Sequence, residues 1–138
     1  MFPCRGKSAV QQANELVDSV YQSYGMIWID VEINPSSGCS WYSYSSSSNC
    51  DFVLELIDAL EARGKKVGIY SSMYQWEESL GSNYACPEAA KVPIWYAHYD
   101  NRQTFSDFSS FGGWSYPDIK QYVGDTSLCS VGVDLDYY

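Results

Sequence analysis

Apolar and polar positions follow two periods along the chain, and the changes between them predict its elements. Apolar residues recur at helical spacing over 8–21, 51–63 and 73–80. Short apolar runs, typical of strands buried in a parallel sheet, cover 26–31, 66–71 and 92–98. Ser8 stands before the first helix, Asn49 or Ser48 can cap the second, and Gly64 follows its end. Strands and helices therefore alternate, which predicts an α/β fold with a parallel sheet and right-handed crossovers.

Two segments show neither period and are expected to be loops. They cover the serine-rich residues 35–48 and residues 100–117. Two further apolar runs, 119–123 and 131–134, predict closing strands around a turn over 124–130. The chain has 138 residues and shows no internal repeat or linker. It is therefore expected to form a single domain over residues 1–138.

The first predicted strand ends in two carboxylates, Asp30 and Glu32. Side chains at i and i+2 of a strand point to the same face, with Cα atoms roughly 6.5 Å apart. Active sites of α/β folds lie at these strand ends. Like charges so close push their pKa values apart, as glycoside hydrolysis requires of its two carboxyl groups. A strand that merely exits into solvent explains the tripeptide as well, so the motif alone assigns no function.

The ends of the other predicted strands carry aromatic, polar and acidic side chains. They are Tyr70, Trp95, Tyr96, His98, Gln121, Tyr122, Asp134 and Asp136. Because parallel strands end at one rim, these side chains should meet. One acid can protonate a glycosidic oxygen, and another can stabilise a developing oxocarbenium ion. Aromatic rings stack on sugars, and glutamine binds hydroxyl and amide groups. The meeting of these side chains at one rim predicts a carbohydrate cleft. The role of His98 in it stays open, because a lone histidine is more often structural than catalytic.

Charge and composition exclude several classes of partner. The formal net charge is −9, and eight basic residues cannot form the surface that nucleic acids and anionic membranes require. No apolar run reaches the 18 or more residues of a transmembrane helix. Aromatic residues make up 17% of the chain, with 13 Tyr and 5 Trp, which suits stacking on an uncharged or weakly charged polymer. We therefore expect neither nucleic acid nor a membrane as a partner.

The cysteines bear on disulfides, metals and compartment. They stand at positions 4, 39, 50, 86 and 129, without C-x-x-C spacing and with a single histidine in the chain, so no metal or other cofactor is expected. Cys39 and Cys50 bracket the serine-rich loop and are predicted to form a disulfide. A disulfide favours a secreted or lysosomal/phagosomal protein. The odd count leaves one thiol without a partner, and the start of the chain reads as internal, without a signal peptide.

Five motifs in a fixed order carry a family resemblance. They are IWIDVE over 27–32, GIYSS over 68–72, PIWYAHY over 93–99, KQY over 120–122 and VDLDYY over 133–138. In this order they resemble glycoside hydrolase family 25, the N-acetylmuramidase or Chalaropsis-type lysozymes, above all its cysteine-bearing eukaryotic members. The resemblance implies an irregular flavodoxin-like β/α barrel. It also implies hydrolysis of the β-1,4 bond between N-acetylmuramic acid and N-acetylglucosamine in bacterial peptidoglycan, for cell-wall catabolism and antibacterial defence or digestion.

The resemblance also implies a role for individual residues. Glu32 matches the family's proton donor, Asp30 the acid that assists at the anomeric side, and Asp134 the acid of the closing motif. The positions that shape the cleft around the sugar match Tyr70, Trp95, Tyr96 and Gln121. Family members open with a strand that ends in another cleft aspartate, and nothing before Ser8 matches it. The barrel is therefore expected to lack its first two β/α units, and the chain to act as a monomer on peptidoglycan glycan strands.

Three functions stay open at this point. In a retaining muramidase, Glu32 is the acid and base, while Asp30, or the substrate's N-acetyl group oriented by Asp30, stabilises the anomeric centre. A chitinase-like hydrolase shares the D-x-E strand end but needs further acids where Met26 and Trp28 stand. A non-catalytic glycan-binding or immune-recognition protein keeps the cleft and releases no reducing ends.

Overall fold

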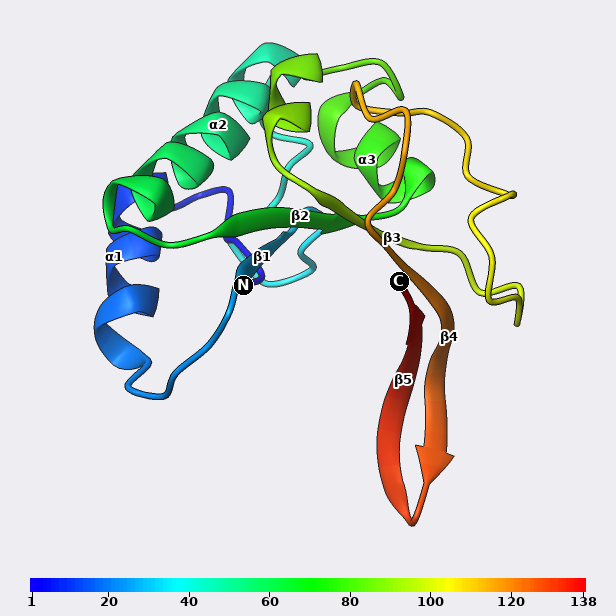
Figure 1. The fold of residues 1–138 in the computed structure, drawn as a ribbon. Helices are drawn as coiled ribbons and strands as arrows, with labels where there is room; N and C mark the ends of the chain where they lie inside the picture. Colours follow the sequence, from blue (N-terminus) through cyan, green and yellow to red (C-terminus); the bar gives the residue numbers. More distant parts are fainter.

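A curled sheet of five strands, covered by helices on one face, forms the fold in the computed structural model, which describes residues 1–138 (Figure 1). The elements in chain order are α1 (Ala9–Ser19), β1 (Ile27–Asp30), α2 (Ser46–Ala62), β2 (Val67–Ser71), α3 (Met73–Leu80), the 3-10 helix η1 (Pro87–Lys91), β3 (Ile94–Ala97), β4 (Ile119–Leu128) and β5 (Val131–Tyr137). The strands lie in the order β1-β2-β3-β4-β5, and the first four are parallel. The predicted α/β class is therefore confirmed, with the sheet curled into a half-barrel. None of the helices is both long and apolar enough to cross a bilayer.

Burial alternates along the parallel strands and separates two faces of the sheet. In β1, Ile27 and Ile29 are buried, whereas Trp28 and Asp30 between them are partly exposed. The buried face packs on α2, whose core side chains are Phe52, Val53, Leu56, Ile57 and Leu60. Figure 1 shows the helices gathered on this side of the sheet. The opposite face, which we call the open face, presents polar and aromatic side chains.

Serine hydroxyls determine where the helices begin. The N-cap residues of α1, α2 and α3, each accepting a backbone N–H from three residues further on, are Ser8, Ser45 and Ser72. The predicted start of α2 at Asp51 was wrong, because Ser45 is the cap in place of Asn49 or Ser48. Asn49 is instead buried, and its amide donates to backbone carbonyls of the preceding loop and of α3. The serine-rich segment therefore contributes the first turn of α2.

β4 and β5 form a hairpin that projects away from the helices (Figure 1). The predicted turn over 124–130 is wrong, because the strands pair up to a two-residue turn at Cys129 and Ser130. Both turn residues have positive φ, 51° and 63°, the backbone of a type I′ hairpin turn. Neither is the glycine or asparagine that usually marks such a turn, so the sequence carries no local signal for it.

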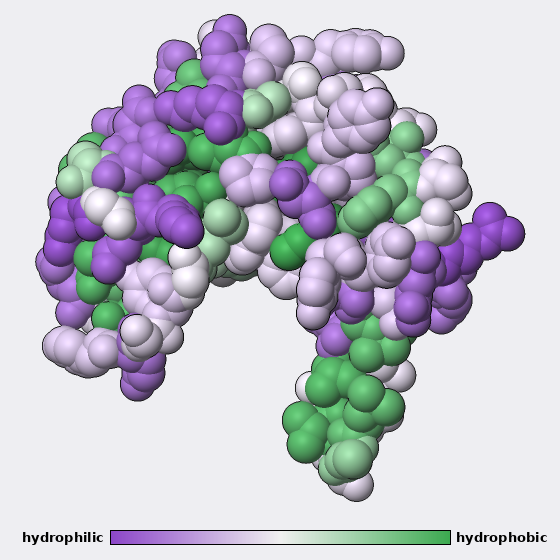
Figure 2. Space-filling view, viewed as in Figure 1, coloured by the Kyte–Doolittle hydropathy of each residue, from purple (hydrophilic) through white to green (hydrophobic).

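The outer part of this hairpin is apolar. Leu128 and Val131, the pair beside the turn, are 55% and 60% exposed. Figure 2 shows hydrophobic side chains gathered along the hairpin, whereas the helical layer is mostly hydrophilic on its surface. The beginning of β4 pairs with β3, whereas the outer part of the hairpin pairs only with itself.

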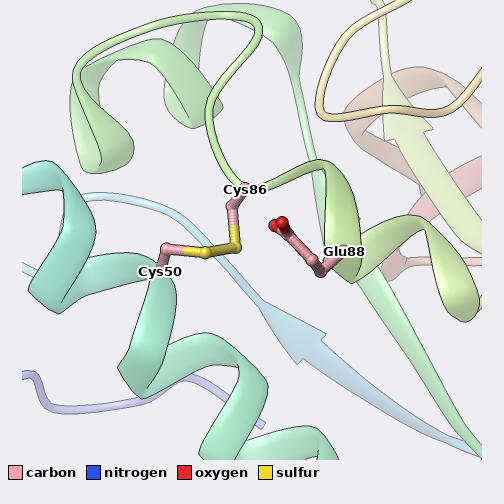
Figure 3. Close-up of side chains that lie close together, drawn as sticks. All are labelled: Cys50, Cys86 and Glu88. Carbon is pink, nitrogen blue, oxygen red and sulfur yellow. A yellow bond between two sulfur atoms is a disulfide. The ribbon is translucent and has the colours of Figure 1, made fainter.

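Two disulfides join segments that are far apart in the sequence. Cys4 bonds to Cys39, and Cys50 bonds to Cys86, with Cα–Cα distances of 4.4 and 5.3 Å. The predicted bond between Cys39 and Cys50 is wrong, because Cys50 lies within α2 and points toward the residue that precedes η1 (Figure 3). Glu88 lies beside this disulfide in Figure 3, but both sulfur atoms are bonded to each other, so the group offers no thiolate to a metal.

Candidate active site

Asp30 and Glu32 lie at the carboxyl end of β1, on the open face. Asp30 is the last residue of β1 and is paired with Tyr70 of β2. Val31 between the two acids is fully buried, so both carboxylates lie on the opposite side of the strand. One carboxylate oxygen of Asp30, Oδ1, is buried without a hydrogen-bond partner. The strand therefore brings together two acids, one of which is poorly solvated.

The environment raises the pKa of both carboxyl groups. Burial raises the pKa of Asp30 to about 7, and the nearby charge of Glu32 adds to this effect. The amino group of Met1, which donates to the Trp28 carbonyl at 2.7 Å, opposes it in part. Burial also raises the pKa of Glu32. The pair can therefore hold a proton near neutral pH, as a general acid requires.

Aromatic side chains form a cluster beside Asp30. The Trp95 ring meets Trp28 edge-on at a centroid distance of 5.7 Å and Tyr70 at 4.9 Å. The register explains the cluster, because Trp28 faces Gly68 and Tyr70 faces Trp95 in adjacent strands. A Cβ atom at Gly68 would lie 2.3 Å from the Trp28 ring, so this glycine makes room for the indole.

Gln121 of β4 joins this cluster through its amide oxygen. The oxygen accepts hydrogen bonds from the hydroxyls of Tyr70 at 2.5 Å and Tyr99 at 3.1 Å. Burial and the contact with Tyr99 raise the pKa of Tyr70, so its hydroxyl stays protonated and donates. The structure thus brings Gln121 together with Tyr70 and Trp95, as the sequence predicts from their strand ends.

A cleft of about 600 Å³ opens beside this pair of acids, and Glu32 lines it while Asp30 does not. Its walls come from α3 and from the segment after β3. Tyr96 also lines the cleft, although it lies on the face of β3 opposite to Trp95. Its hydroxyl donates to Asp107 at 3.1 Å, and its ring packs against Phe108 at 5.0 Å. Tyr96 and Trp95 therefore belong to different walls of the site.

The hairpin separates the two acids of the closing motif. Asp136 is paired with Gln121 and accepts the indole N–H of Trp95 at 2.8 Å. Asp134 lies nearer the hairpin tip, where it accepts the backbone N–H of Asp125 at 2.9 Å, and no contact joins it to Asp30. The reason is that β5 is antiparallel, so its residues do not reach the rim as the end of a parallel strand. Asp136 takes the place beside the aromatic cluster that the sequence assigns to Asp134.

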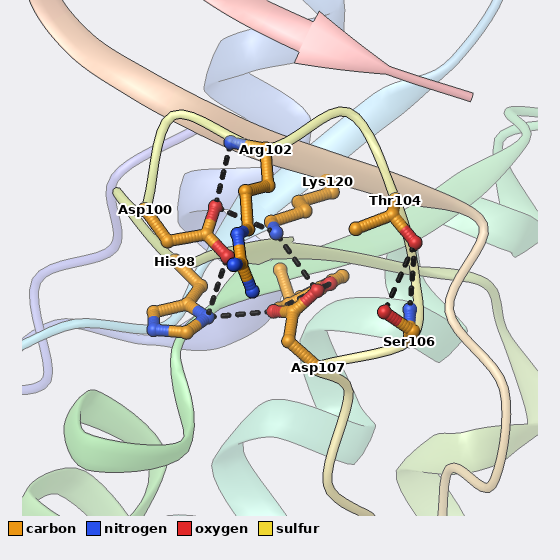
Figure 4. Close-up of polar contacts among 8 residues, drawn as sticks. His98, Asp100, Arg102, Thr104, Ser106, Asp107 and Lys120 are labelled. Atoms are coloured by element: carbon orange, nitrogen blue, oxygen red, sulfur yellow. Dashed lines mark hydrogen bonds and ion pairs between the residues drawn. The ribbon is translucent and has the colours of Figure 1, made fainter.

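An ion cluster at the wall of the cleft, built around Lys120, had no counterpart in the sequence prediction. Lys120 is fully buried, and its ammonium donates to Asp100 and Asp107 at 2.8 Å each (Figure 4). His98 places Nδ1 2.6 Å from Asp107. Burial alone would raise the pKa of Asp107, but hydrogen bonds from His98 and Lys120 lower it to about 2. The only signal in the sequence was a lysine at a strand position that the fold buries.

Comparisons with known proteins determine the family. The family model described as Lys-1, lysozyme-like protein 1, matches residues 1–122. The chain belongs to this lysozyme-like family. It is 37% identical to Probable GH family 25 lysozyme 2 of Dictyostelium discoideum, over 100% of this chain and 63% of that protein. It is 41% identical to Counting factor 50 of the same organism, over 95% of this chain and 41% of that protein. The resemblance to glycoside hydrolase family 25 is thereby confirmed.

The fold also has a counterpart among solved structures. It is similar to that of the muramidase from Acremonium alcalophilum, with a TM-score of 0.75, 20% sequence identity, and coverage of 99% of this chain and 64% of that chain. At this identity the likeness concerns the fold. The chain spans less than two thirds of the length of each of these three proteins. That the barrel lacks its first two β/α units stays a prediction.

Proposed function

We propose that this chain carries the acid pair of a muramidase that hydrolyses the β-1,4 bond between N-acetylmuramic acid and N-acetylglucosamine in bacterial peptidoglycan. The observation that carries the proposal is the pair Asp30 and Glu32, two carboxyl groups with raised pKa values at a strand end beside a cleft. Membership of the lysozyme-like family supports it.

Glu32 is the proton donor in this proposal. It lines the cleft, so a bound glycan can reach its carboxyl group, and burial keeps that group protonated to a higher pH than usual. The acid protonates the glycosidic oxygen as the bond breaks and then, as carboxylate, takes a proton from the attacking water. Because hydrolysis begins with this proton transfer, activity falls as the pH rises above the range in which the acid pair holds its proton.

Asp30 acts at the anomeric carbon. Its carboxylate opposes the positive charge of the oxocarbenium-like transition state, either directly or by orienting the N-acetyl group of the substrate. One oxygen of this carboxylate has no hydrogen-bond partner in the protein, so no donor offsets its negative charge. Productive catalysis needs a proton on Glu32 and a negative charge on Asp30, whereas in the free protein burial favours the proton on Asp30, whose pKa is raised to about 7. The active form is therefore the one in which Asp30 has lost its proton and Glu32 has kept one.

The aromatic cluster supports the sugar that contains the reacting carbon. Trp95, Tyr70 and Trp28 offer ring surface next to Asp30. The oxygen of Gln121 is occupied by two tyrosine hydroxyls, which leaves its amide N–H groups for sugar oxygens. Tyr96 shapes the wall of the cleft, since its hydroxyl is bound to Asp107. We assign no catalytic step to Asp134, which is bonded within the hairpin and makes no contact with Asp30 or Glu32.

The disulfides and the net charge of the protein both agree with this substrate. Two disulfides favour an oxidising compartment, so we infer a secreted or lysosomal/phagosomal location. The net charge of −9 suits a glycan strand better than a polyanion. We propose that the protein acts on that strand as a monomer.

Hydrolysis of purified peptidoglycan tests the proposal. The chain should clear a bacterial cell-wall suspension and release fragments whose new reducing end, identified by mass spectrometry, is N-acetylmuramic acid. Glu32→Gln should lower the rate by about 10²- to 10⁴-fold while the fold is kept, because the amide cannot donate the proton. A fully active Glu32→Gln variant would contradict the assignment. Binding to peptidoglycan without new reducing ends would show a glycan-binding protein instead.

A further inference from the structure

We propose that His98 binds a neutral N-acetylhexosamine residue in the cleft beside Glu32, and that Asp107 and Lys120 hold its ring in place for this purpose. The site rests on the proposed function, because it is the leaving-group side of the bond that Glu32 protonates. Its occupant is the sugar that departs after cleavage.

The position of His98 differs from that of a structural histidine. Its side chain is 55% exposed and lines the same cleft as Glu32. Nδ1 faces the carboxylate of Asp107, and Figure 4 shows the other ring nitrogen pointing away from the ion cluster. No protein group bonds that nitrogen, Nε2. The ring is therefore bound on one edge and free on the edge that a ligand can reach.

Asp107 determines the tautomer of this ring. Because its low pKa keeps Asp107 ionised, the carboxylate only accepts hydrogen bonds, so Nδ1 of His98 must carry the proton. In the neutral ring Nε2 then presents a lone pair, which accepts a sugar hydroxyl. The orientation of His98 and its hydrogen-bonding character thus follow from one carboxylate.

Lys120 anchors that carboxylate from behind. It is fully buried between Asp100 and Asp107, and burial lowers its pKa less than the two carboxylates raise it. The donor atoms of His98, Asp100 and Asp107 lie within 4.8 Å of one another, close enough for a metal ion. The ammonium already bonds both carboxylates, however, so a divalent cation there would face a buried positive charge. The cluster therefore serves to position His98.

The other walls of the cleft identify the ligand as a neutral sugar. Glu77 lines it and disfavours the carboxylates of a lactyl group or peptide stem. The rings of Tyr74 and Tyr99, 67% and 58% exposed, suit stacking on a sugar.

Two amide side chains add polar groups to the same cleft. Gln75 and Asn83 both line it, and the Oδ1 atom of Asn83 has no hydrogen-bond partner in the protein. Amides of this kind suit the hydroxyl and acetamido groups of an N-acetylated sugar. N-acetylglucosamine, the neutral leaving group in muramidase chemistry, fits these walls.

The first test uses the fact that the chain has a single histidine, so that its ring signals are unambiguous in NMR. Chitotriose, three β-1,4-linked N-acetylglucosamine residues, is titrated into the Glu32→Gln variant, which removes turnover. The ring signals of His98, Nε2 above all, should shift saturably, whereas cellotriose, which lacks acetamido groups, should shift them less. Binding that moves tryptophan signals but leaves His98 unmoved overturns the site, and so does the absence of chitotriose binding at millimolar concentration.

The second test separates binding from chemistry. His98→Phe keeps the ring and removes both nitrogens, so the KM for soluble peptidoglycan fragments should rise about tenfold, as for one lost hydrogen bond, with kcat changed less than about threefold. His98→Gln, whose amide can reach the place of Nε2, should recover part of the loss. Tyr116→Phe, at an exposed position outside the cleft, is the matched control and should change neither constant.

The positioning role of Asp107 has its own readout. Asp107→Asn should convert the single Nδ1–H tautomer of His98, seen in its ¹⁵N shifts, into a mixture and raise KM as His98→Phe does. An unchanged tautomer with an unchanged KM contradicts the role.

The two proposals fail differently. If the native chain releases no reducing ends but chitotriose still shifts His98, hydrolysis is refuted and the sugar site stands. If hydrolysis occurs and His98→Phe leaves KM unchanged, the sugar site is refuted and hydrolysis stands.

Discussion

The indole N–H of Trp95 donates to the carboxylate of Asp136 at 2.8 Å, which links the centre of the aromatic cluster to the C-terminal hairpin. β3 and β5 are not neighbours in the sheet, so this contact reaches across β4. It stabilises the ring that contacts both Trp28 and Tyr70, and thereby the surface on which we place the sugar.

Asp136→Ala should therefore disturb the aromatic cluster. We expect a changed tryptophan fluorescence spectrum and a KM for soluble peptidoglycan fragments raised by about three- to tenfold, because one charged hydrogen bond to the indole is lost. Asp134→Ala is the matched control, since it removes a hydrogen bond only within the hairpin. Loss of activity in Asp134→Ala with normal folding would restore Asp134 as a catalytic residue.

Asp30→Asn should stabilise the protein at neutral and alkaline pH. The pKa of Asp30 is raised to about 7, so the folded state binds its proton more tightly than the unfolded state, and stability falls as the pH rises from about 4 to 7. The amide removes this loss, which corresponds to an increase on the order of 1–3 kcal/mol in the free energy of unfolding at pH 8. Urea unfolding at pH 4 and pH 8 measures the difference. An equal effect of the substitution at both pH values would contradict the raised pKa.

Lys120→Met should be strongly destabilising. The apolar side chain fills the space but leaves Asp100 and Asp107 without their cation, and breaking a buried pair in this way costs on the order of 3 kcal/mol. Denaturant unfolding at pH 7 measures the loss, with Lys91→Met, which removes an exposed ion pair to Asp58, as the control. A Lys120→Met variant as stable as the control would refute the structural role of the cluster.

Acid should weaken the same cluster. Because the pKa of Asp107 is lowered to about 2, its stabilising contribution is complete above the usual value of 3.8 and is lost as the pH falls from there toward 2. The ¹⁵N shifts of His98 should report the change in this pH range, since Asp107 then no longer accepts the Nδ1 proton.

A thiol count tests the disulfide pairing. The native protein should react with one equivalent of a thiol reagent at Cys129, which is exposed, and with five after unfolding and reduction. Cys129→Ser should bring the native value to zero. Peptide mapping should recover Cys4 with Cys39 and Cys50 with Cys86. A peptide joining Cys39 to Cys50 would contradict the structure.

The sequence by itself determined those features that depend on residues close together in the chain, namely helices, strands and the faces on which side chains lie. Hydrophobic period predicted α3 over Met73–Leu80 and a strand that ends at the two acids, because helix and strand formation respond to spacing within a few residues. The common direction of Asp30 and Glu32 follows from the geometry of a single strand. The order of motifs was sufficient to indicate the lysozyme-like family, which the comparisons confirm.

Only the tertiary structure decided which distant segments meet. Cys50 bonds to Cys86 because its position on α2 directs the side chain toward η1. The number of residues between two cysteines in the sequence does not reveal this orientation. Asp136 rather than Asp134 reaches Trp95 because β5 returns antiparallel from a turn without a glycine or asparagine signal. Lys120 becomes an internal cation because a loop residue, Asp107, folds over it. Each outcome depends on strand register and on loop closure between remote residues, which local propensity does not specify.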